Sequence, residues 1–333
     1  RFIADDPAVK IDRPRKQVHT QKGIVVDYDR LILATGSKPF VPPVKGADLK
    51  GVVSFRDIYD VNTMLEYCEN KRNAVVIGGG LLGLEAAYGL KRRGMNVTVL
   101  HLMNRIMERQ LDDRASQMLR HSIEQKGIRI ITEANTEALI GKNGHVSQIR
   151  LKDGTLLDAD LVVFAVGIRP NITLAQSAGL RCNRGILVND TMQTFDPSIY
   201  AVGECIEHRN QTFGLVEPLW GQAFICASHL AEHGSLTFKS PTVPTQLKVS
   251  GVDVFSAGNF EPKEDYEDII LNDEKRHIYK RIIIQKDKVI GAVLFGDTED
   301  GMWYAELIAD QTPVSTFRNK LLFGKDFALK KAG

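Results

Sequence analysis

The chain has 333 residues, enough for two or three domains, and its apolar content of 43% and charged content of 25% are ordinary for a soluble globular protein. A net charge of +2 gives no electrostatic case for nucleic acid or membrane binding, and no apolar run approaches the roughly 20 residues of a membrane helix. The four cysteines form no C-x-x-C pair, which argues against a disulfide scaffold or a metal site. We therefore expect a cytoplasmic protein.

The first 43 residues predict a small β-rich segment. Residues 17–20 and 23–26 read as a hairpin that leads into an apolar strand at 31–34. The run Lys38-Pro39-Phe40-Val41-Pro42-Pro43 is expected to break regular structure, because proline lacks an amide donor and restricts its neighbours. We take this run as the first domain boundary.

The middle of the chain alternates strand and helix patterns. The expected strands cover 74–77, 96–101 and 128–131, and the expected helices cover 81–93 and 112–126. This alternation predicts an α/β domain with a parallel sheet and crossover helices. A hairpin at 149–151 and 156–158 follows.

The last part of the chain changes character. Strands at 185–188 and 199–202 and a helix at 223–233 should belong with the first domain. Beyond Pro244 the pattern is that of antiparallel strands at 245–249, 279–285 and 289–295, followed by a helix at 302–309. These elements predict a separate α+β domain.

An internal repeat is the strongest signal in the sequence. Residues 23–39 recur at 154–170, offset by 131 positions without a gap, with the glycine, both aspartates, the apolar run, Ala-x-Gly and the proline in step. Such self-similarity indicates two domains of one fold. Gly78 precedes Gly167 by 89 residues, so the equivalent glycine of the first copy would fall upstream of Arg1. The first copy is therefore expected to be truncated.

The second copy is preceded by Gly78-x-Gly80-x-x-Gly83, which follows an apolar strand and opens a helix. Gly78 permits a tight turn, Gly80 lets the backbone approach a pyrophosphate, and Gly83 lets helix and strand pack closely. The phosphates would sit on the helix N-terminus. The alternative is a glycine cluster that only packs a helix.

Two polar residues near this fingerprint are candidates for cofactor contacts. The position where an acidic residue usually binds the ribose of NAD carries His101. His101 either hydrogen-bonds a ribose, or favours a 2′-phosphate with Arg105 nearby, or is a surface histidine, so NADH and NADPH both stay open. Glu85, expected on the first turn of the helix, either faces the nicotinamide or only complements the helix dipole.

Residues 194–204 hold a third signature, an apolar strand that ends in Gly203 and Glu204. It resembles the second FAD motif of flavoprotein reductases, in which an aspartate binds the ribitol chain; Glu204 is one methylene longer. The segment Glu217-Pro218-Leu219-Trp220 precedes the predicted helix, whose N-terminus would stabilise reduced flavin. The alternative is a structural cap with Trp220 in the core.

Together these motifs resemble the FAD-dependent pyridine nucleotide reductases, in which an NAD domain is inserted into a homologous FAD domain. Residues 101–112, 200–208 and 296–304 are most similar to the reductase module of the NAD(P)H-dependent nitrite reductase large subunit. The resemblance implies an α/β fold with two homologous Rossmann-like domains and a C-terminal α+β domain. The implied ranges are 1–43 with 172–240 for FAD, 44–171 for NAD(P), and 241–333 for the C-terminal domain.

The resemblance also implies which residues contact each cofactor. The implied FAD contacts are Ala34, Thr35, Gly36, Gly203, Glu204, Leu219 and Trp220. The implied NADH or NADPH contacts are Gly78, Gly80, Leu81, Leu82, Gly83, Glu85, His101, Val166 and Gly167. No catalytic side chain is required beyond Glu85 as a candidate near the nicotinamide, because the flavin carries the chemistry.

The implied function is transfer of hydride from NAD(P)H to FAD and of single electrons onward to an iron–sulfur or sirohaem nitrite reductase centre. No cysteine cluster near the C-terminus could ligate such a centre, so this chain alone should not reduce nitrite. The first alternative is a stand-alone rubredoxin or ferredoxin reductase, whose acceptor is an electron-carrier protein. The second is a truncated nucleotide-binding protein without turnover. A homodimer stays open.

Overall fold

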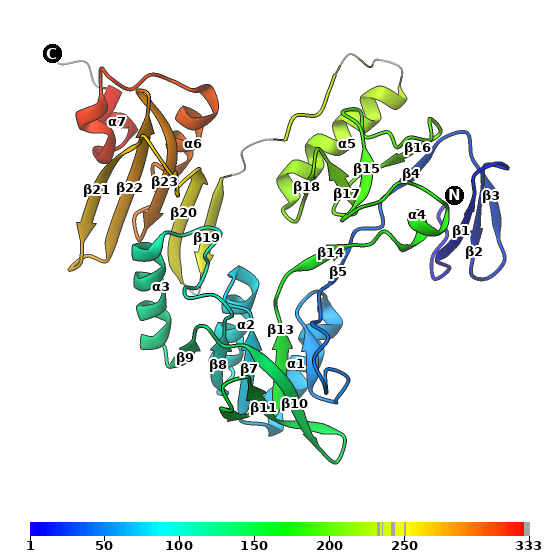
Figure 1. Ribbon diagram of the computed structural model, residues 1–333, viewed down its shortest axis with the longest axis horizontal. Coiled ribbons are helices and arrows are strands. Elements are labelled where there is room, and N and C mark those ends of the chain that lie inside the picture. Colours follow the sequence, from blue (N-terminus) through cyan, green and yellow to red (C-terminus); the bar gives the residue numbers. More distant parts are fainter. Residues whose placement is uncertain (232–233, 235, 241–243, 250, 330–333) are drawn as a thin grey trace. The chain divides into compact units, whose positions relative to one another are not determined.

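The computed structural model describes residues 1–231, 234, 236–240, 244–249 and 251–329. The chain forms two compact units, each built from two separate stretches of sequence (Figure 1). The first unit comprises Arg1–Phe40 and Gly167–Pro241, and the second comprises Val41–Val166 and Thr242–Gly333. Residues 44–171, expected to form the NAD(P) domain, and residues 241–333, expected to form the C-terminal domain, thus lie mainly in the second unit.

A five-stranded parallel sheet forms the centre of the second unit, as the alternating pattern predicts. Its strand order is β6-β13-β7-β8-β9. The strands are β6 (Val52–Ser54), β7 (Asn73–Ile77), β8 (Asn96–Leu100), β9 (Ile128–Ile131) and β13 (Leu161–Phe164). The accompanying helices are α1 (Ile58–Asn70), α2 (Leu81–Arg92) and α3 (Asp113–Gln125).

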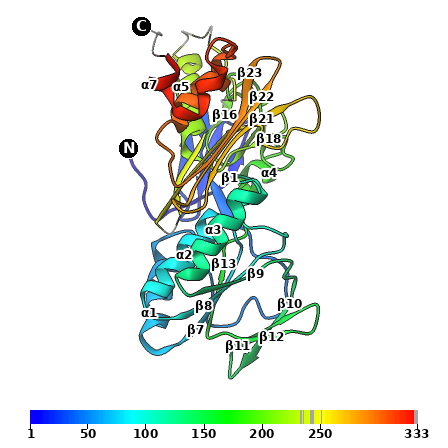
Figure 2. The ribbon, with the colours of Figure 1, turned by 90° about the vertical axis from the view of Figure 1, so that its left-hand side faces the viewer.

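The two faces of this sheet are covered differently (Figure 2). The helices α1, α2 and α3 pack on one face, where Val76, Val99 and Val163 are fully buried. A meander of β10 (Thr136–Lys142), β11 (His145–Leu151) and β12 (Leu156–Asp158) packs on the other. The predicted hairpin is therefore confirmed, with β10 as an additional strand.

A five-stranded antiparallel sheet of order β19-β20-β23-β22-β21 forms the C-terminal part of the second unit. Its strands are β19 (Thr245–Val249), β20 (Val252–Gly258), β21 (Glu267–Asp273), β22 (Ile278–Gln285) and β23 (Lys288–Phe295). The helix α6 (Gly301–Asp310) packs on this sheet, followed by the 3₁₀ helix η1 (Arg318–Phe323) and α7 (Lys325–Leu329). This agrees with the predicted antiparallel character, although β20 and β21 were not predicted.

One carboxylate joins the C-terminal sheet to the part of the second unit that holds the parallel sheet. Asp112 caps α3 by accepting from the amide of Ala115 at 3.0 Å. The same side chain accepts from the Tyr279 hydroxyl at 2.8 Å and from the Arg281 guanidinium at 3.2 Å. Burial, together with the negative charge of Asp112, raises the pKa of Tyr279. The hydroxyl therefore stays protonated and remains a donor.

The first unit contains shorter sheets. Its strands are β1 (Ala8–Asp12), β2 (Gln17–Thr20), β3 (Val25–Asp27), β4 (Leu31–Leu33), β5 (Ser37–Pro39), β14 (Ile168–Pro170), β15 (Ile186–Val188), β16 (Ile199–Ala201), β17 (Ile206–His208) and β18 (Gln211–Thr212). Its helices are α4 (Thr173–Ser177) and α5 (Val216–Leu230). The strands β1, β2 and β3 form an antiparallel meander, and β4 pairs in parallel with β16.

Two expectations for the first unit are corrected. The break expected from Lys38 onward begins later, because β5 pairs with β14 through Pro39 in an antiparallel ribbon. The helix expected to begin at residue 223 begins at Val216, so Pro218 lies within its first turn, where a missing amide donor costs no helical hydrogen bond. The expected end at His233 lies outside the described residues.

Candidate functional sites

The glycine fingerprint folds as the sequence predicts, as a tight turn between β7 and α2. Gly78 has φ +125°, and a Cβ there would overlap the carbonyl of Ala165. A Cβ at Gly83 would overlap the carbonyl of Gly78. A Cβ at Gly80 would meet no atom within 4 Å. Two glycines therefore allow close packing, and the middle one leaves the approach to the turn open.

The N-terminus of α2 is suited to bind an anion. Gly80 caps the helix without a side-chain hydrogen bond, and no acidic residue lies in its first turn. Leu81 is half-buried against the core and Leu82 is 46% exposed. The amides that begin α2 are thus available, with the helix dipole favouring negative charge.

Glu85 is the fifth residue of α2 and lies in its second turn, which corrects the expected position in the first turn. Glu85 is largely exposed, and the limited burial of its carboxyl raises the pKa of that group. The dipole effect falls off within the first turn, so complementing the dipole explains this residue poorly.

His101 lies at the end of β8 and is buried, so the surface-histidine alternative is wrong. Its Nδ1 accepts from the amide of Gly79 at 3.0 Å, and its Nε2 lies 3.0 Å from a carboxylate oxygen of Glu108. Arg105, the other basic candidate, pairs with Asp113 at 2.7 Å and with Glu261. Neither Gly79 nor Glu108 was singled out by the sequence.

The loops that follow β4 and β16 meet at one edge of the first unit. The two strands are parallel neighbours, and Val202 donates its amide to the carbonyl of Leu33 at 3.0 Å. The predicted FAD residues at 34–36 and 203–204 therefore leave the sheet side by side. A Cβ at Gly36 or Gly203 would meet no atom within 4 Å, so the backbone of each loop has free space beside it.

Glu204 is positioned by a residue that the sequence did not indicate. The hydroxyl of Ser37 donates to a carboxylate oxygen of Glu204 at 2.6 Å. The hydroxyl of Thr35 instead donates to the carbonyl of Asn171 at 2.6 Å. The carboxylate is thereby held beside the loop of the first copy, despite its additional methylene.

The helix α5 contributes two further residues near this edge. Gln222, which is fully buried, accepts from the Gly203 amide at 2.8 Å, while its own amide nitrogen has no partner among the described residues. Leu219 packs against the core of the first unit. Trp220 is 73% exposed, so the alternative that placed it in the core is wrong.

The remaining predicted contacts, Val166 and Gly167, lie where the chain passes from the second unit to the first. Gly167 has φ +97°, and its carbonyl accepts from the Phe40 amide at 2.9 Å. The amide of Asn171 donates in turn to the carbonyl of Gly36 at 2.9 Å.

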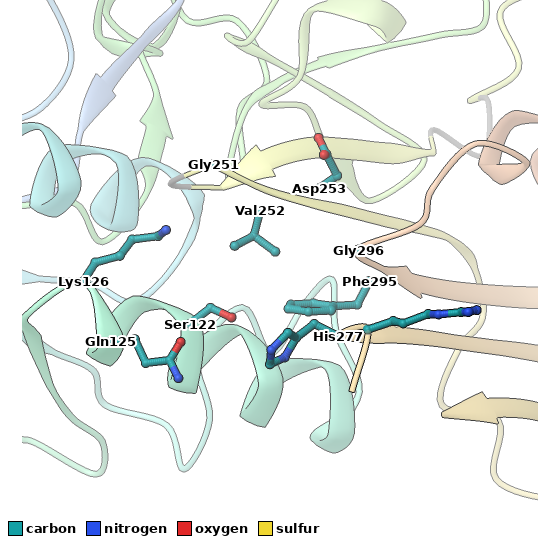
Figure 3. A pocket seen from close by; sticks show the side chains of 10 residues that line it. Ser122, Gln125, Lys126, Gly251, Val252, Asp253, His277, Phe295 and Gly296 are labelled. Carbon is teal, nitrogen blue, oxygen red and sulfur yellow. The ribbon is translucent and has the colours of Figure 1, made fainter. Parts of the chain in front are cut away.

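A polar groove of about 440 Å³ lies between the end of α3 and the C-terminal sheet (Figure 3). Lys126, His277, Asp253 and Phe295 are among the residues that line it. None of the predicted cofactor contacts lines this groove. In the described part of the chain, no helix is long and apolar enough to cross a membrane, and no group of three acidic, histidine or cysteine side chains is arranged to hold a metal ion.

Comparison with known proteins identifies both parts of the chain. The family model for pyridine nucleotide-disulphide oxidoreductases matches residues 1–223. The model for the rubredoxin NAD+ reductase C-terminal domain matches residues 244–312.

Individual relatives give the same result. The chain is 48% identical over 95% of its length to a nitrite reductase [NAD(P)H] of Bacillus subtilis, of which it covers 39%. It is 41% identical over 95% of its length to the assimilatory nitrate reductase electron transfer subunit of the same organism, of which it covers 41%. The chain therefore spans about two fifths of the length of each of these two relatives.

Among solved structures, an NAD-dependent persulfide reductase from A. fulgidus superposes with a TM-score of 0.86 at 28% identity, covering 95% of this chain and 63% of that one. The α/β fold with a C-terminal domain is thus shared with an NAD-dependent reductase of known structure. The chain belongs to the pyridine nucleotide-disulphide oxidoreductase family, a family of FAD-dependent enzymes that use NAD(P)H.

Proposed function

We propose that this chain is the NAD(P)H-oxidising flavin module of a nitrite reductase of the large-subunit type. It would take hydride from NAD(P)H and deliver electrons to an iron–sulfur and sirohaem centre outside the described chain. The observation that carries the proposal is the open fingerprint turn before α2, in one chain with the paired loops where Ser37 holds Glu204. The similarity to proteins named nitrite reductase supports it.

Each element of the chain has a defined task in this proposal. The first amides of α2 bind the pyrophosphate of NAD(P)H, and Glu85 lies toward the nicotinamide. Glu204, oriented by Ser37, binds the ribitol of FAD, and the N-terminus of α5 stabilises negative charge on the reduced flavin. Bound FAD supplies the step from two-electron to one-electron transfer.

The other proposed contacts surround these groups. Toward NADH or NADPH they are Gly78, Gly80, Leu81, Leu82, Gly83, Val166 and Gly167, and toward FAD they are Ala34, Thr35, Gly36, Gly203, Leu219 and Trp220. The domain ranges 1–43 with 172–240, 44–171 and 241–333, a cytoplasmic location and a homodimer belong to the same proposal.

The test begins with the purified chain and added FAD under anaerobic conditions. We expect flavin absorbance to remain with the protein after gel filtration and to bleach when NADH or NADPH is added. A protein that binds NADH but never retains FAD would overturn the reductase proposal for this chain. It would favour a nucleotide-binding protein without turnover.

A second candidate function is a stand-alone reductase of rubredoxin or another small electron carrier. The match of residues 244–312 to the C-terminal domain of rubredoxin reductases favours it. Stopped-flow mixing of the NADH-reduced protein with rubredoxin distinguishes the two functions. Rapid reduction of rubredoxin would support the second function, and slow reduction of rubredoxin beside rapid transfer to nitrite reductase domains would support the first.

A further inference from the structure

The second residue of the fingerprint, Gly79, has both of its backbone polar groups occupied by one neighbouring loop. Its amide donates to Nδ1 of His101 at 3.0 Å. Its carbonyl accepts from the amide of Met107 at 3.0 Å. A Cβ at Gly79 would lie 2.8 Å from Cγ of His101 and 2.9 Å from the side chain of Ile106. Residues 101–107 thus hold the turn by a hydrogen bond to each backbone polar group of Gly79 and by side chains packed against its Cα.

The hydrogen bonds of His101 define its tautomer. Because Nδ1 accepts from Gly79, the ring proton must be on Nε2, which then donates to Glu108 at 3.0 Å. In the other tautomer an Nδ1–H group would face the Gly79 N–H, donor against donor. The Glu108 carboxylate, which accepts only, therefore selects the tautomer that binds the turn.

We propose that His101 and Glu108 are positioning residues that hold the fingerprint turn in its nucleotide-binding conformation. The inference rests on the proposed binding of NAD(P)H at this turn and replaces a direct contact between His101 and the ribose. Both ring nitrogens are already engaged, and the side chain is only 10% exposed. The Gly79 amide is likewise engaged, so the pyrophosphate is received by the amides of Gly80 and of the first turn of α2.

Two substitutions separate the two hydrogen bonds of the ring. His101→Asn keeps a polar atom near the position of Nδ1 and loses the bond to Glu108. His101→Gln keeps a polar atom near the position of Nε2 and loses the bond to Gly79. We expect His101→Gln to raise the dissociation constant of NADH about tenfold, the effect of one buried hydrogen bond, and His101→Asn to recover most of that loss.

The matched control is a second buried histidine–carboxylate pair. Nε2 of His208, on β17 of the first unit, lies 2.8 Å from Asp190, and its Nδ1 has no partner among the described residues. His208→Asn, which loses the bond between Nε2 and Asp190, should lower the melting temperature about as much as His101→Gln does, and should leave NADH affinity unchanged. A shared loss of NADH affinity would show that the effect is general destabilisation and would overturn the inference.

The measurements are a direct fluorescence titration with NADH and amide hydrogen exchange of residues 75–84 in the nucleotide-free protein. We expect faster exchange at Gly79 in His101→Gln and in Glu108→Ala, and near-normal exchange in His101→Asn. Unchanged exchange in both His101→Gln and Glu108→Ala would overturn the positioning role. Equal loss of NADH binding in the Asn and Gln variants with normal exchange would instead support a direct contact with the nucleotide.

These outcomes separate the inference from the proposed function. If the wild-type chain binds no NADH, the proposed function fails, and exchange at Gly79 still decides whether His101 holds the turn. If the wild-type chain binds NADH and His101→Gln binds it equally well, only the inference fails.

Discussion

The two copies of the internal repeat form the same local structure within unequal sheets. The bounds of β12 are those of β3 shifted by 131 residues, and the bounds of β14 are those of β5 shifted by the same number. Even a side-chain hydrogen bond is repeated, since Gln17 donates to Asp27 and Gln148 donates to Asp158, each at 2.9 Å. Residue pattern alone is therefore sufficient to fix the hairpin and the turn that follows.

Burial distinguishes the copies. In the second copy β13 lies between β6 and β7, and all four of its residues are buried. In the first copy β4 pairs with β16 alone among the described strands, and Ile32 is 47% exposed. Val163, the equivalent of Ile32, is fully buried. Within the given sequence, the same apolar run is thus buried to different extents in the two copies.

The copies also meet each other through equivalent residues. In the β5–β14 ribbon Lys38 lies opposite Arg169, its counterpart at the offset of 131. Two like charges face each other there, and the Arg169 guanidinium lies over the Phe40 ring at 3.8 Å. A cation over an aromatic face is attracted by it, which offsets the repulsion.

The largest expected effect comes from closing the fingerprint turn that precedes the second copy. Gly83→Ala places a Cβ against the Gly78 carbonyl and should cost about 1–3 kcal/mol of unfolding free energy, together with most NADH affinity. Chemical denaturation and fluorescence titration measure the two losses. Gly89→Ala on the same helix is the control, because a Cβ there meets no atom within 4 Å and should stabilise the protein slightly. Similar losses in both variants would contradict the role of Gly83.

The next effect tests the difference in burial at equivalent positions. Val163→Ala should destabilise the protein by about 2 kcal/mol because it leaves a cavity in the buried sheet. Ile32→Ala, although it removes more atoms, should cost less than about 1 kcal/mol because the side chain is half in solvent. Urea denaturation measures the loss of unfolding free energy in each variant. A larger loss for Ile32→Ala than for Val163→Ala would contradict the prediction.

A smaller effect concerns acid stability of the first unit. Burial raises the pKa of Asp196, but its hydrogen bonds to Arg13 at 2.8 Å and to the Ser198 amide outweigh burial, so the folded-state pKa is lowered. Such a group stabilises the folded state fully at pH values above its pKa in the unfolded chain, which is near 4. This stabilisation is lost as the pH falls through the lower pKa of the folded state. Melting temperatures measured from pH 6 to pH 2 should fall less steeply for Asp196→Asn than for the wild type. Parallel curves would contradict this.

The smallest effect tests the repeated hydrogen bond. Gln17→Ala and Gln148→Ala each remove an exposed bond and should each cost less than about 1 kcal/mol. Because the local geometry is the same in both copies, we expect the two losses to agree within about 0.5 kcal/mol. A clear difference in denaturation midpoint would show that the surrounding sheets act on the hairpins as well.

The features that the sequence predicted are those encoded locally. Gly78, Gly80 and Gly83 specify a turn by the space that they leave, and the offset of the repeat locates β12 and β14. The helix α1 could have been predicted, because Asp57 and Asp60 form a capping box at its start. It was missed because its apolar pattern is weak.

The features that were missed depend on residues distant in sequence. The role of His101 is defined by Gly79, 22 positions before it, and the orientation of Glu204 by Ser37, 167 positions before it. The start of α5 was placed too late, because Pro218 was expected to precede the helix rather than to lie within its first turn, where proline is tolerated. Periodicity carries no information about such pairings.

The shared carboxylate of Asp112 has a consequence for exchanging parts between related reductases. Because one side chain both caps α3 and binds the C-terminal sheet, a grafted C-terminal domain would need a phenol and a guanidinium in place of Tyr279 and Arg281. Without them the graft would leave an unpaired negative charge in a buried seam, and the helix that it caps would lose stability with it. Compatibility between recombined halves of such proteins can therefore be checked at three positions before any gene is made.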